Sequence, residues 1–105
     1  MAFWNLPALQ LQQFRPGIMS KAEHGADLTM VCMEIAAGKE DTGHEHPFDQ
    51  CGVILSGEIE MFVGKERKML STHESYFIPA GLLHGWKTFD SSVKLLDISS
   101  SKPLG

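Results

Sequence analysis

The chain has 105 residues, of which 43% are hydrophobic and 21% are charged, and its formal net charge is −4. This length and composition predict one small soluble globular domain with little room for a second. The mild negative charge and the lack of a basic patch argue against nucleic-acid binding, and no apolar run approaches the ~20 residues that span a bilayer.

The beginning of the chain and its cysteines bear on its location. The first residues lack the charged region and following apolar core of a signal peptide. Cys32 and Cys51 lie in apolar surroundings and far apart in sequence, so we expect both to be reduced thiols. These features predict a cytoplasmic protein without a membrane or nucleic-acid partner.

The pattern of apolar runs and turn residues is that of an all-β protein. The only stretch that suggests a helix lies near the N-terminus, at residues 8–14. After it come short runs rich in Val, Ile, Phe and Met, separated by Gly, Asp, Ser and Pro. The strands that we expect are residues 28–35, 51–55, 58–63, 67–70, 76–78, 84–89 and 93–98. The first of these is apolar on both faces, so it is either central in its sheet or part of a dimer contact. Such strands suggest a β-sandwich or barrel with a pocket at one mouth.

Three of the five histidines fall into one arrangement with a glutamine: His44-Glu45-His46, then Gln50, then a distant His84. A strand places residues i and i+2 on the same face, so the first two histidines can point into one cavity. Neutral imidazole is the commonest side-chain ligand for divalent transition metals, and an amide oxygen can complete such a site. The residues alone leave other roles open: the histidine pair could lie on the surface beside a turn, His84 in the core, and Gln50 apart from any metal.

Two stretches resemble the two motifs of the cupin family. Gly38, His44-Glu45-His46, Gln50 and Gly57 are spaced as in the first motif, and the stretch Ile-Pro-Ala-Gly-Leu-Leu-His that ends at His84 is similar to the second. The resemblance implies a small cupin of the single-domain cupin 2 type over residues 1–105, folded as a double-stranded β-helix, the jelly-roll barrel. It places an N-terminal arm at about 1–14, the first motif at 38–57 and the second at about 73–88. It also implies one divalent transition metal ion (Zn, Ni, Mn or Fe), with the ligands His44, His46, Gln50 and His84.

The chain departs from the family pattern at three places. Gln50 stands where the first motif usually has glutamate, His73-Glu74 replaces the Gly-Asp turn before the second motif, and Thr88 stands where asparagine is frequent. The glutamine bears on the chemistry, because a glutamate would cancel one unit of the metal's charge. With a neutral ligand the divalent ion keeps its full charge, which favours Lewis-acid chemistry over redox chemistry.

Among cupins, Gln50 and the stretch Gly-Val-Ile-Leu-Ser-Gly-Glu at 52–58 are similar to the pectin-degradation (KdgF-type) members. Those proteins act on unsaturated monouronates and promote ring opening to the linear keto sugar acid. The resemblance implies that Asp97 is the catalytic acid or base. The family's aromatic residue two positions after this aspartate is Ser99 here, and its arginine farther along has no clear counterpart.

Two aromatic residues near the motifs are candidates for substrate binding. Trp86 follows His84 by two residues and could stack against a sugar ring, and Phe48 could wall the mouth of the pocket. The residues alone also allow Trp86 and Phe48 to be packing residues and Asp97 to make a structural hydrogen bond.

The sequence therefore predicts a metal-binding cupin that acts on a sugar acid, such as an unsaturated uronate, or a similar oxygenated metabolite, by Lewis-acid ring opening, isomerisation or lyase chemistry. Two alternatives stay open: a cupin dioxygenase that uses iron, and a non-catalytic cupin that binds a small ligand. We further expect a homodimer, because small jelly rolls leave edge strands and apolar faces that need covering. The apolar residues of the N-terminal arm should pack on the barrel or on a partner subunit.

Overall fold

The computed structural model describes residues 2–100. Within these residues the chain forms one short 3₁₀ helix and ten β-strands. The helix is η1 (Leu6–Ala8), and the strands are β1 (Gln12–Arg15), β2 (Ile18–His24), β3 (Leu28–Ile35), β4 (Glu40–His44), β5 (Gln50–Ser56), β6 (Ile59–Val63), β7 (Glu66–Leu70), β8 (Ser75–Ile78), β9 (His84–Thr88) and β10 (Val93–Ser100).

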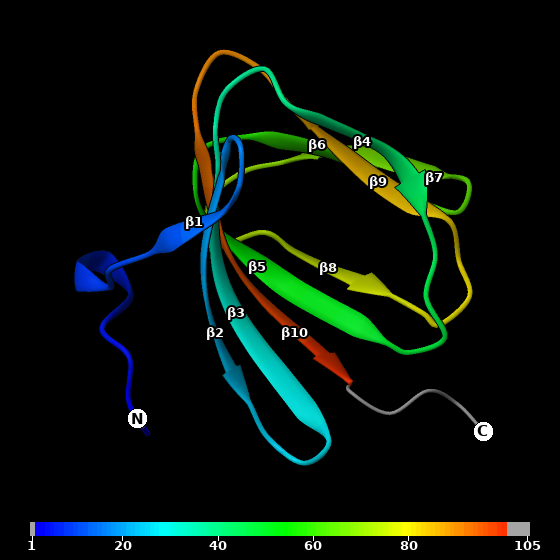
Figure 1. The fold of residues 1–105 in the computed structure, drawn as a ribbon. Coiled ribbons are helices and arrows are strands. Elements are labelled where there is room, and N and C mark those ends of the chain that lie inside the picture. Colours follow the sequence, from blue (N-terminus) through cyan, green and yellow to red (C-terminus); the bar gives the residue numbers. More distant parts are fainter. Residues whose placement is uncertain (1, 101–105) are drawn as a thin grey trace.

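Two antiparallel sheets face each other and form a jelly-roll barrel (Figure 1). The larger sheet has six strands in the order β1-β2-β3-β10-β5-β8, and the smaller sheet has four in the order β4-β9-β6-β7. Strands far apart in sequence are neighbours in both sheets; β10, for example, lies between β3 and β5. This arrangement confirms the predicted all-β class and the jelly-roll barrel.

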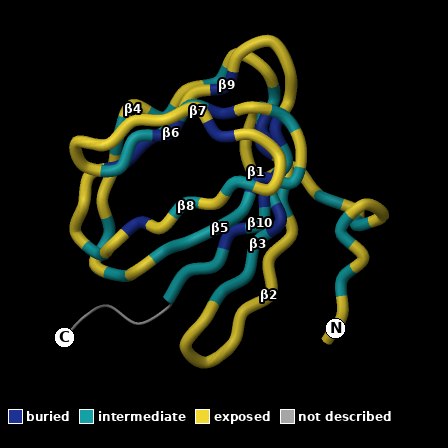
Figure 2. The backbone as a smooth tube through the Cα atoms, turned by 180° about the vertical axis from the view of Figure 1, so that it is seen from behind, coloured by how far each residue is buried: buried dark blue, intermediate teal, exposed yellow. Residues whose placement is uncertain are grey.

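The apolar core fills the space between the two sheets, where the buried segments of the backbone gather (Figure 2). Ile35, Ile54 and Ile59 are fully buried, and each such side chain stabilises the fold by about 1.5–3 kcal/mol relative to its exposed state. On β10 every second residue from Val93 to Asp97 is buried. A carboxylate therefore continues the row of inward-facing apolar side chains, which marks that end of the strand as more than core.

The structure confirms the strands expected from residue 28 onward, with ends that differ by no more than two residues. It also places β3 inside its sheet, between β2 and β10, which agrees with one of the two explanations for its apolar faces. The strands β1, β2 and β4 are not among the expected ones. They carry mostly exposed or polar residues, so their sequences lack the alternation that marks a half-buried strand.

The helix suggested at 8–14 is wrong. Residues 12–15 form β1, which pairs with β2 through a tight turn at Pro16 and Gly17. Gly17 has a φ of 82°, a left-handed conformation that glycine adopts readily. Hydrogen bonding across this hairpin outweighs any local helix preference.

The N-terminal arm contacts the barrel, which is one of the two positions expected for it. The Lys94 ammonium on β10 donates a hydrogen bond to the Leu6 carbonyl oxygen at 2.6 Å. Between residues 2 and 100 no helix has the length and apolar character that crossing a membrane requires.

Candidate metal centre

Three imidazole rings meet where β4 and β9 pair. His44 is the last residue of β4 and lies opposite His84, the first residue of β9. His46 lies two residues past the end of β4, so the expectation that both motif histidines share one strand is wrong. The rings nevertheless converge: their centroids are 4.3–4.9 Å apart, and one nitrogen of each lies within 4.8 Å of the other two. Among the described residues this is a group of side chains that could hold a metal ion.

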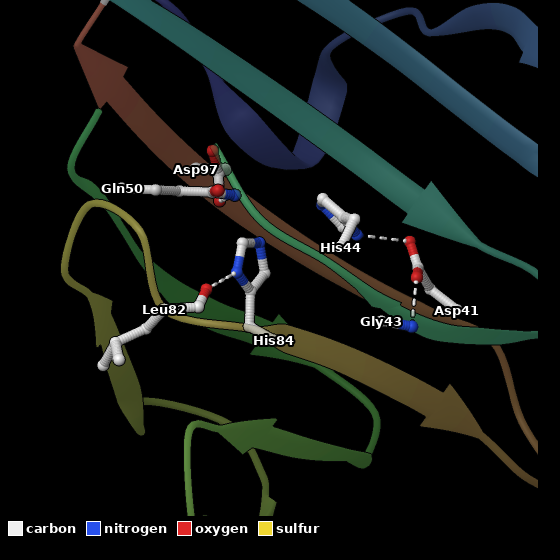
Figure 3. Close-up of polar contacts among 7 residues, drawn as sticks. All are labelled: Asp41, Gly43, His44, Gln50, Leu82, His84 and Asp97. Atoms are coloured by element: carbon white, nitrogen blue, oxygen red, sulfur yellow. Dashed lines mark hydrogen bonds and ion pairs between the residues drawn. The ribbon is translucent and has the colours of Figure 1, made fainter. Parts of the chain in front are cut away.

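Two of the three rings are oriented by hydrogen bonds at Nδ1 (Figure 3). The Nδ1 of His84 lies 3.0 Å from the Leu82 carbonyl oxygen, and the Nδ1 of His44 lies 3.0 Å from Oδ2 of Asp41. Both partners can only accept, so each neutral ring carries its proton on Nδ1 and leaves Nε2 with a free lone pair. The Nε2 of His84 is buried and has no hydrogen-bond partner. Outer hydrogen bonds of this kind commonly fix metal-binding histidines.

His46 is held by stacking. Its ring lies on the Phe48 ring at a centroid distance of 4.4 Å and an angle of 6° between the planes, and its buried Nδ1 has no partner. Burial lowers the pKa of His46, and the nearby charges of His84 and His44 lower it further. The neutral ring, which is the form that binds a metal, is therefore favoured.

The amide of Gln50 joins this group to Asp97. Its Nε2 donates to Oδ2 of Asp97 at 2.7 Å, and its Oε1 is buried without a partner. The hydroxyl of Tyr76 donates to the same Oδ2 of Asp97. Burial raises the pKa of Asp97, against the opposing effect of the hydrogen bonds from Gln50 and Tyr76. Burial also raises the pKa of Tyr76, followed by the charge of Asp97, so the phenol stays protonated and acts as a donor.

A glycine makes the contact between Tyr76 and Asp97 possible. Gly52 on β5 pairs with Asp97 on one side and with Tyr76 on the other, so it lies between the two in the sheet. A Cβ at Gly52 would lie 2.3 Å from the Tyr76 hydroxyl oxygen. The tyrosine therefore reaches across β5 only because this position has no side chain.

The cluster opens into a cavity of about 170 Å³ inside the barrel. Its wall includes His44, Gln50, His84 and Asp97, together with the predicted substrate residue Trp86. Phe48, the other predicted substrate residue, is not part of this wall and packs against His46 instead.

The motif residues singled out in the sequence thus come together, whereas some of their partners carried no motif signal. Asp41 orients His44, and Tyr76 holds Asp97. Asp41 lies on β4, a polar strand that the sequence pattern did not reveal. Tyr76 lies on an expected strand, but an amphipathic side chain there fits the core as well as a pocket.

Comparisons with known proteins agree with this geometry. The sequence matches the Cupin domain family over residues 31–99. The pectin degradation protein KdgF of Dickeya dadantii is 31% identical over 77 residues, which cover 72% of this chain and 70% of that protein. The solved structure of KdgF from Halomonas sp. superposes with a TM-score of 0.83 and 28% identity, and the match covers 95% of this chain and 92% of that one. A cupin-fold protein from Thermus thermophilus, TT1209, has the same TM-score at 23% identity, covers 98% of this chain and 100% of its own, and shows the fold alone.

The family match covers more than half of the sequence and contains every residue of the histidine cluster as well as Gln50 and Asp97. The relatives of similar length share the barrel that carries this cluster. The chain belongs to the cupin family.

Proposed function

We propose that this cupin is a metal-dependent enzyme that acts on a small sugar acid, such as an unsaturated uronate, by ring opening or isomerisation. One observation carries the proposal. Three imidazoles and an amide oxygen with unused lone pairs lie in the same enclosed space as a buried carboxylate. Metal binding and proton transfer can thus act on one small molecule.

The residues fit a divalent transition metal ion. The buried atoms without partners, His46 Nδ1, His84 Nε2 and Gln50 Oε1, are the kinds of donor that such ions take. We propose His44, His46, His84 and Gln50 as the ligands of one Zn, Ni, Mn or Fe ion. When bound, the ion would orient the oxygens of a substrate and polarise them as a Lewis acid.

Asp97 is proposed as the group that moves a proton. Its Oδ2 accepts hydrogen bonds from Gln50 and Tyr76, so its orientation is fixed and Oδ1 is the oxygen left for a substrate. The carboxylate lies on the cavity wall with 8% of its surface exposed, which keeps bulk water from competing for the proton. Trp86, on the same wall, offers an aromatic face to a sugar ring.

The choice of a uronate rests on the relatives. The Dickeya dadantii protein is named for pectin degradation. The KdgF-type resemblance in the motifs implies unsaturated monouronates, whose carboxylate and hydroxyl oxygens suit a divalent ion.

The test is a turnover assay with metal-loaded protein and unsaturated monouronates made by a polysaccharide lyase. Loss of the ultraviolet absorbance of the unsaturated ring and appearance of the keto sugar acid by NMR are expected for the natural protein. Asp97→Asn should reduce turnover by about a hundredfold or more while the metal content stays at one equivalent. If Asp97→Asn turns over normally where His84→Ala does not, the proposed role of Asp97 is wrong. Oxygen uptake with bound iron would instead favour the dioxygenase, and ligand-induced stabilisation without product would favour a binding protein.

We also propose a homodimer formed through the outer face of the larger sheet. The inward residues of β10, β5 and β8 line the cavity, so their alternate neighbours Leu96, Ile98, Val53 and Phe77 form an apolar outer face. Phe77 is 61% exposed there, which is unusual for so large an apolar side chain. Light scattering coupled to size-exclusion chromatography should give twice the mass of the chain, and Phe77→Glu should shift it toward the monomer.

A cytoplasmic location stays part of the proposal. Cys32 and Cys51 are both free thiols, as expected in a reducing compartment.

A further inference from the structure

A single arginine lies on the wall of the cavity that holds the histidine cluster. Arg15 is the last residue of β1, the edge strand of the larger sheet. Across the cavity stand Asp41 and His44 from β4, the edge strand of the smaller sheet. The cavity is therefore bounded by the free edges of both sheets. Arg15 is the only lysine or arginine among the described residues that line it.

The carboxylates of this wall already have partners. Asp41 accepts from His44 through one oxygen and from the Gly43 backbone N–H through the other. Asp97 accepts from Gln50 and Tyr76. Neither acid is needed to neutralise the arginine, and neither contacts it.

The guanidinium of Arg15, by contrast, makes no hydrogen bond or ion pair with any residue from 2 to 100. Its one recorded contact is with the ring of Phe14, 5.8 Å from the guanidinium carbon, and this leaves its N–H donors unused. An exposed arginine usually donates to water. Here, however, it borders a cavity whose other charged groups are satisfied, so the unused charge on the wall is positive.

We propose that Arg15 binds the carboxylate of the substrate and so selects small carboxylic acids over neutral sugars of the same shape. The inference rests on the proposed function, because it takes the histidine cluster to hold the other oxygens of the same molecule. A guanidinium presents two parallel N–H groups that match the two oxygens of a carboxylate, and such pairs give both energy and orientation. Arg15 thus fixes one end of the substrate, and the other end lies toward the histidine cluster and Asp97.

The test compares two probes that differ only in charge: galacturonate and galactose, which share a ring and differ by a carboxylate against a hydroxymethyl group. Binding to the metal-loaded protein is measured by titration calorimetry. The natural protein should prefer galacturonate. Arg15→Gln should weaken galacturonate binding by about tenfold or more and abolish the preference, with galactose binding unchanged. Arg15→Lys should keep part of the preference, because lysine retains the charge but not the paired geometry.

The matched control is Arg67→Gln. Arg67 is an exposed arginine on β7 that pairs with Glu60 at 2.8 Å and does not line this cavity. Its replacement should leave both affinities as they are. A merely structural role for Arg15 would change both probes alike, so the ratio of the two affinities separates recognition from folding.

The outcomes also separate this inference from the proposed function. If Arg15→Gln keeps the preference for galacturonate, or if the natural protein has none, the inference is overturned whatever the turnover assay gives. If the preference is present and is lost in Arg15→Gln, the inference holds even where unsaturated uronates are not turned over. In that case only the proposed reaction fails.

Discussion

The amide of Gln50 serves two neighbours that need opposite things. Its N–H donates to Asp97 at 2.7 Å, while its buried carbonyl oxygen has no partner and is left for a metal. A glutamate, the usual residue of the motif, would place two carboxylates at hydrogen-bond distance, and both could not stay charged without cost. The neutral residue at this position is therefore explained by Asp97 as well as by the charge of the metal.

Gln50→Glu tests this explanation. In metal-free protein at neutral pH it should lower the free energy of unfolding by about 1–3 kcal/mol, because the donor to Asp97 is lost and a like charge is added. Urea unfolding measures the change. Adding Asp97→Asn restores a donor opposite the new acceptor and should recover most of the loss. A single variant as stable as the natural protein would contradict the account.

His73 holds a conformation that suits glycine. It has a φ of 72°, the only positive φ outside glycine in residues 2–100, in the turn closed by the Glu74 N–H and the Ser71 carbonyl oxygen. A residue with a side chain pays about 1–2 kcal/mol to adopt this conformation. The departure from the family's Gly-Asp turn is thus a change of residue without a change of backbone.

His73→Gly should accordingly raise the thermal midpoint, with a gain of about 1 kcal/mol or less after the added freedom of the unfolded chain is counted. Thr72→Gly, one residue earlier where φ is not positive, should lower it. Thermal unfolding by circular dichroism compares the two. Equal effects would mean that the turn carries no such strain.

At the scale of the elements, β10, β5 and β8 place Asp97, Gly52 and Tyr76 side by side across three strands. Strand pairing sets this row, and the missing side chain at Gly52 lets Tyr76 cross it. The sequence predicts each of these strands, but not their order in the sheet, because strands far apart in the chain give no local signal of pairing. The contact between Tyr76 and Asp97 could therefore not be predicted.

Gly52→Ala should cost about 1–3 kcal/mol of stability, because the new methyl group overlaps the Tyr76 ring. In a Tyr76→Ala background the cost should be smaller, though not zero, since the Leu96 carbonyl oxygen also lies 2.6 Å from the added Cβ. A double-mutant cycle by urea unfolding measures the coupling. Equal costs in both backgrounds would show that Tyr76 does not depend on Gly52.

The turn between β7 and β8 contributes stability that depends on pH. Glu74 accepts from Lys68 and from the N–H and hydroxyl of Ser71. The hydrogen bond from Lys68, followed by those from Ser71, lowers the pKa of Glu74 to about 2 from its ordinary 4.5. A carboxylate with a lowered folded pKa stabilises above its unfolded pKa and loses this effect as the pH falls toward the folded value.

Glu74→Gln should therefore lower the thermal midpoint at neutral pH at low salt, and the difference should shrink between about pH 4.5 and 2. The group is exposed, so added salt should weaken the effect. A difference that stays constant down to pH 2 would exclude the charge of Glu74 as its cause.

At the scale of the whole molecule, the barrel brings to one cavity residues that the sequence scatters from 15 to 97. Most of the metal cluster was predictable, because cupin motifs keep His44, His46, Gln50 and His84 at recognisable spacing. The N-terminal side of the cavity was not. Arg15 lies on a strand whose exposed residues show no alternation, and only its pairing with β2 brings it to the wall.

The central claim is that the histidine cluster holds one transition metal ion. Its most direct test is metal analysis by mass spectrometry of protein purified without an affinity-metal column, beside His84→Ala and a His24→Ala control. His24 is exposed on β2, outside the cluster. The account predicts one equivalent of a divalent transition metal in the natural protein and in the control, and almost none in His84→Ala. A natural protein that binds no metal even after reloading, or a His84→Ala variant that keeps a full equivalent, would contradict it.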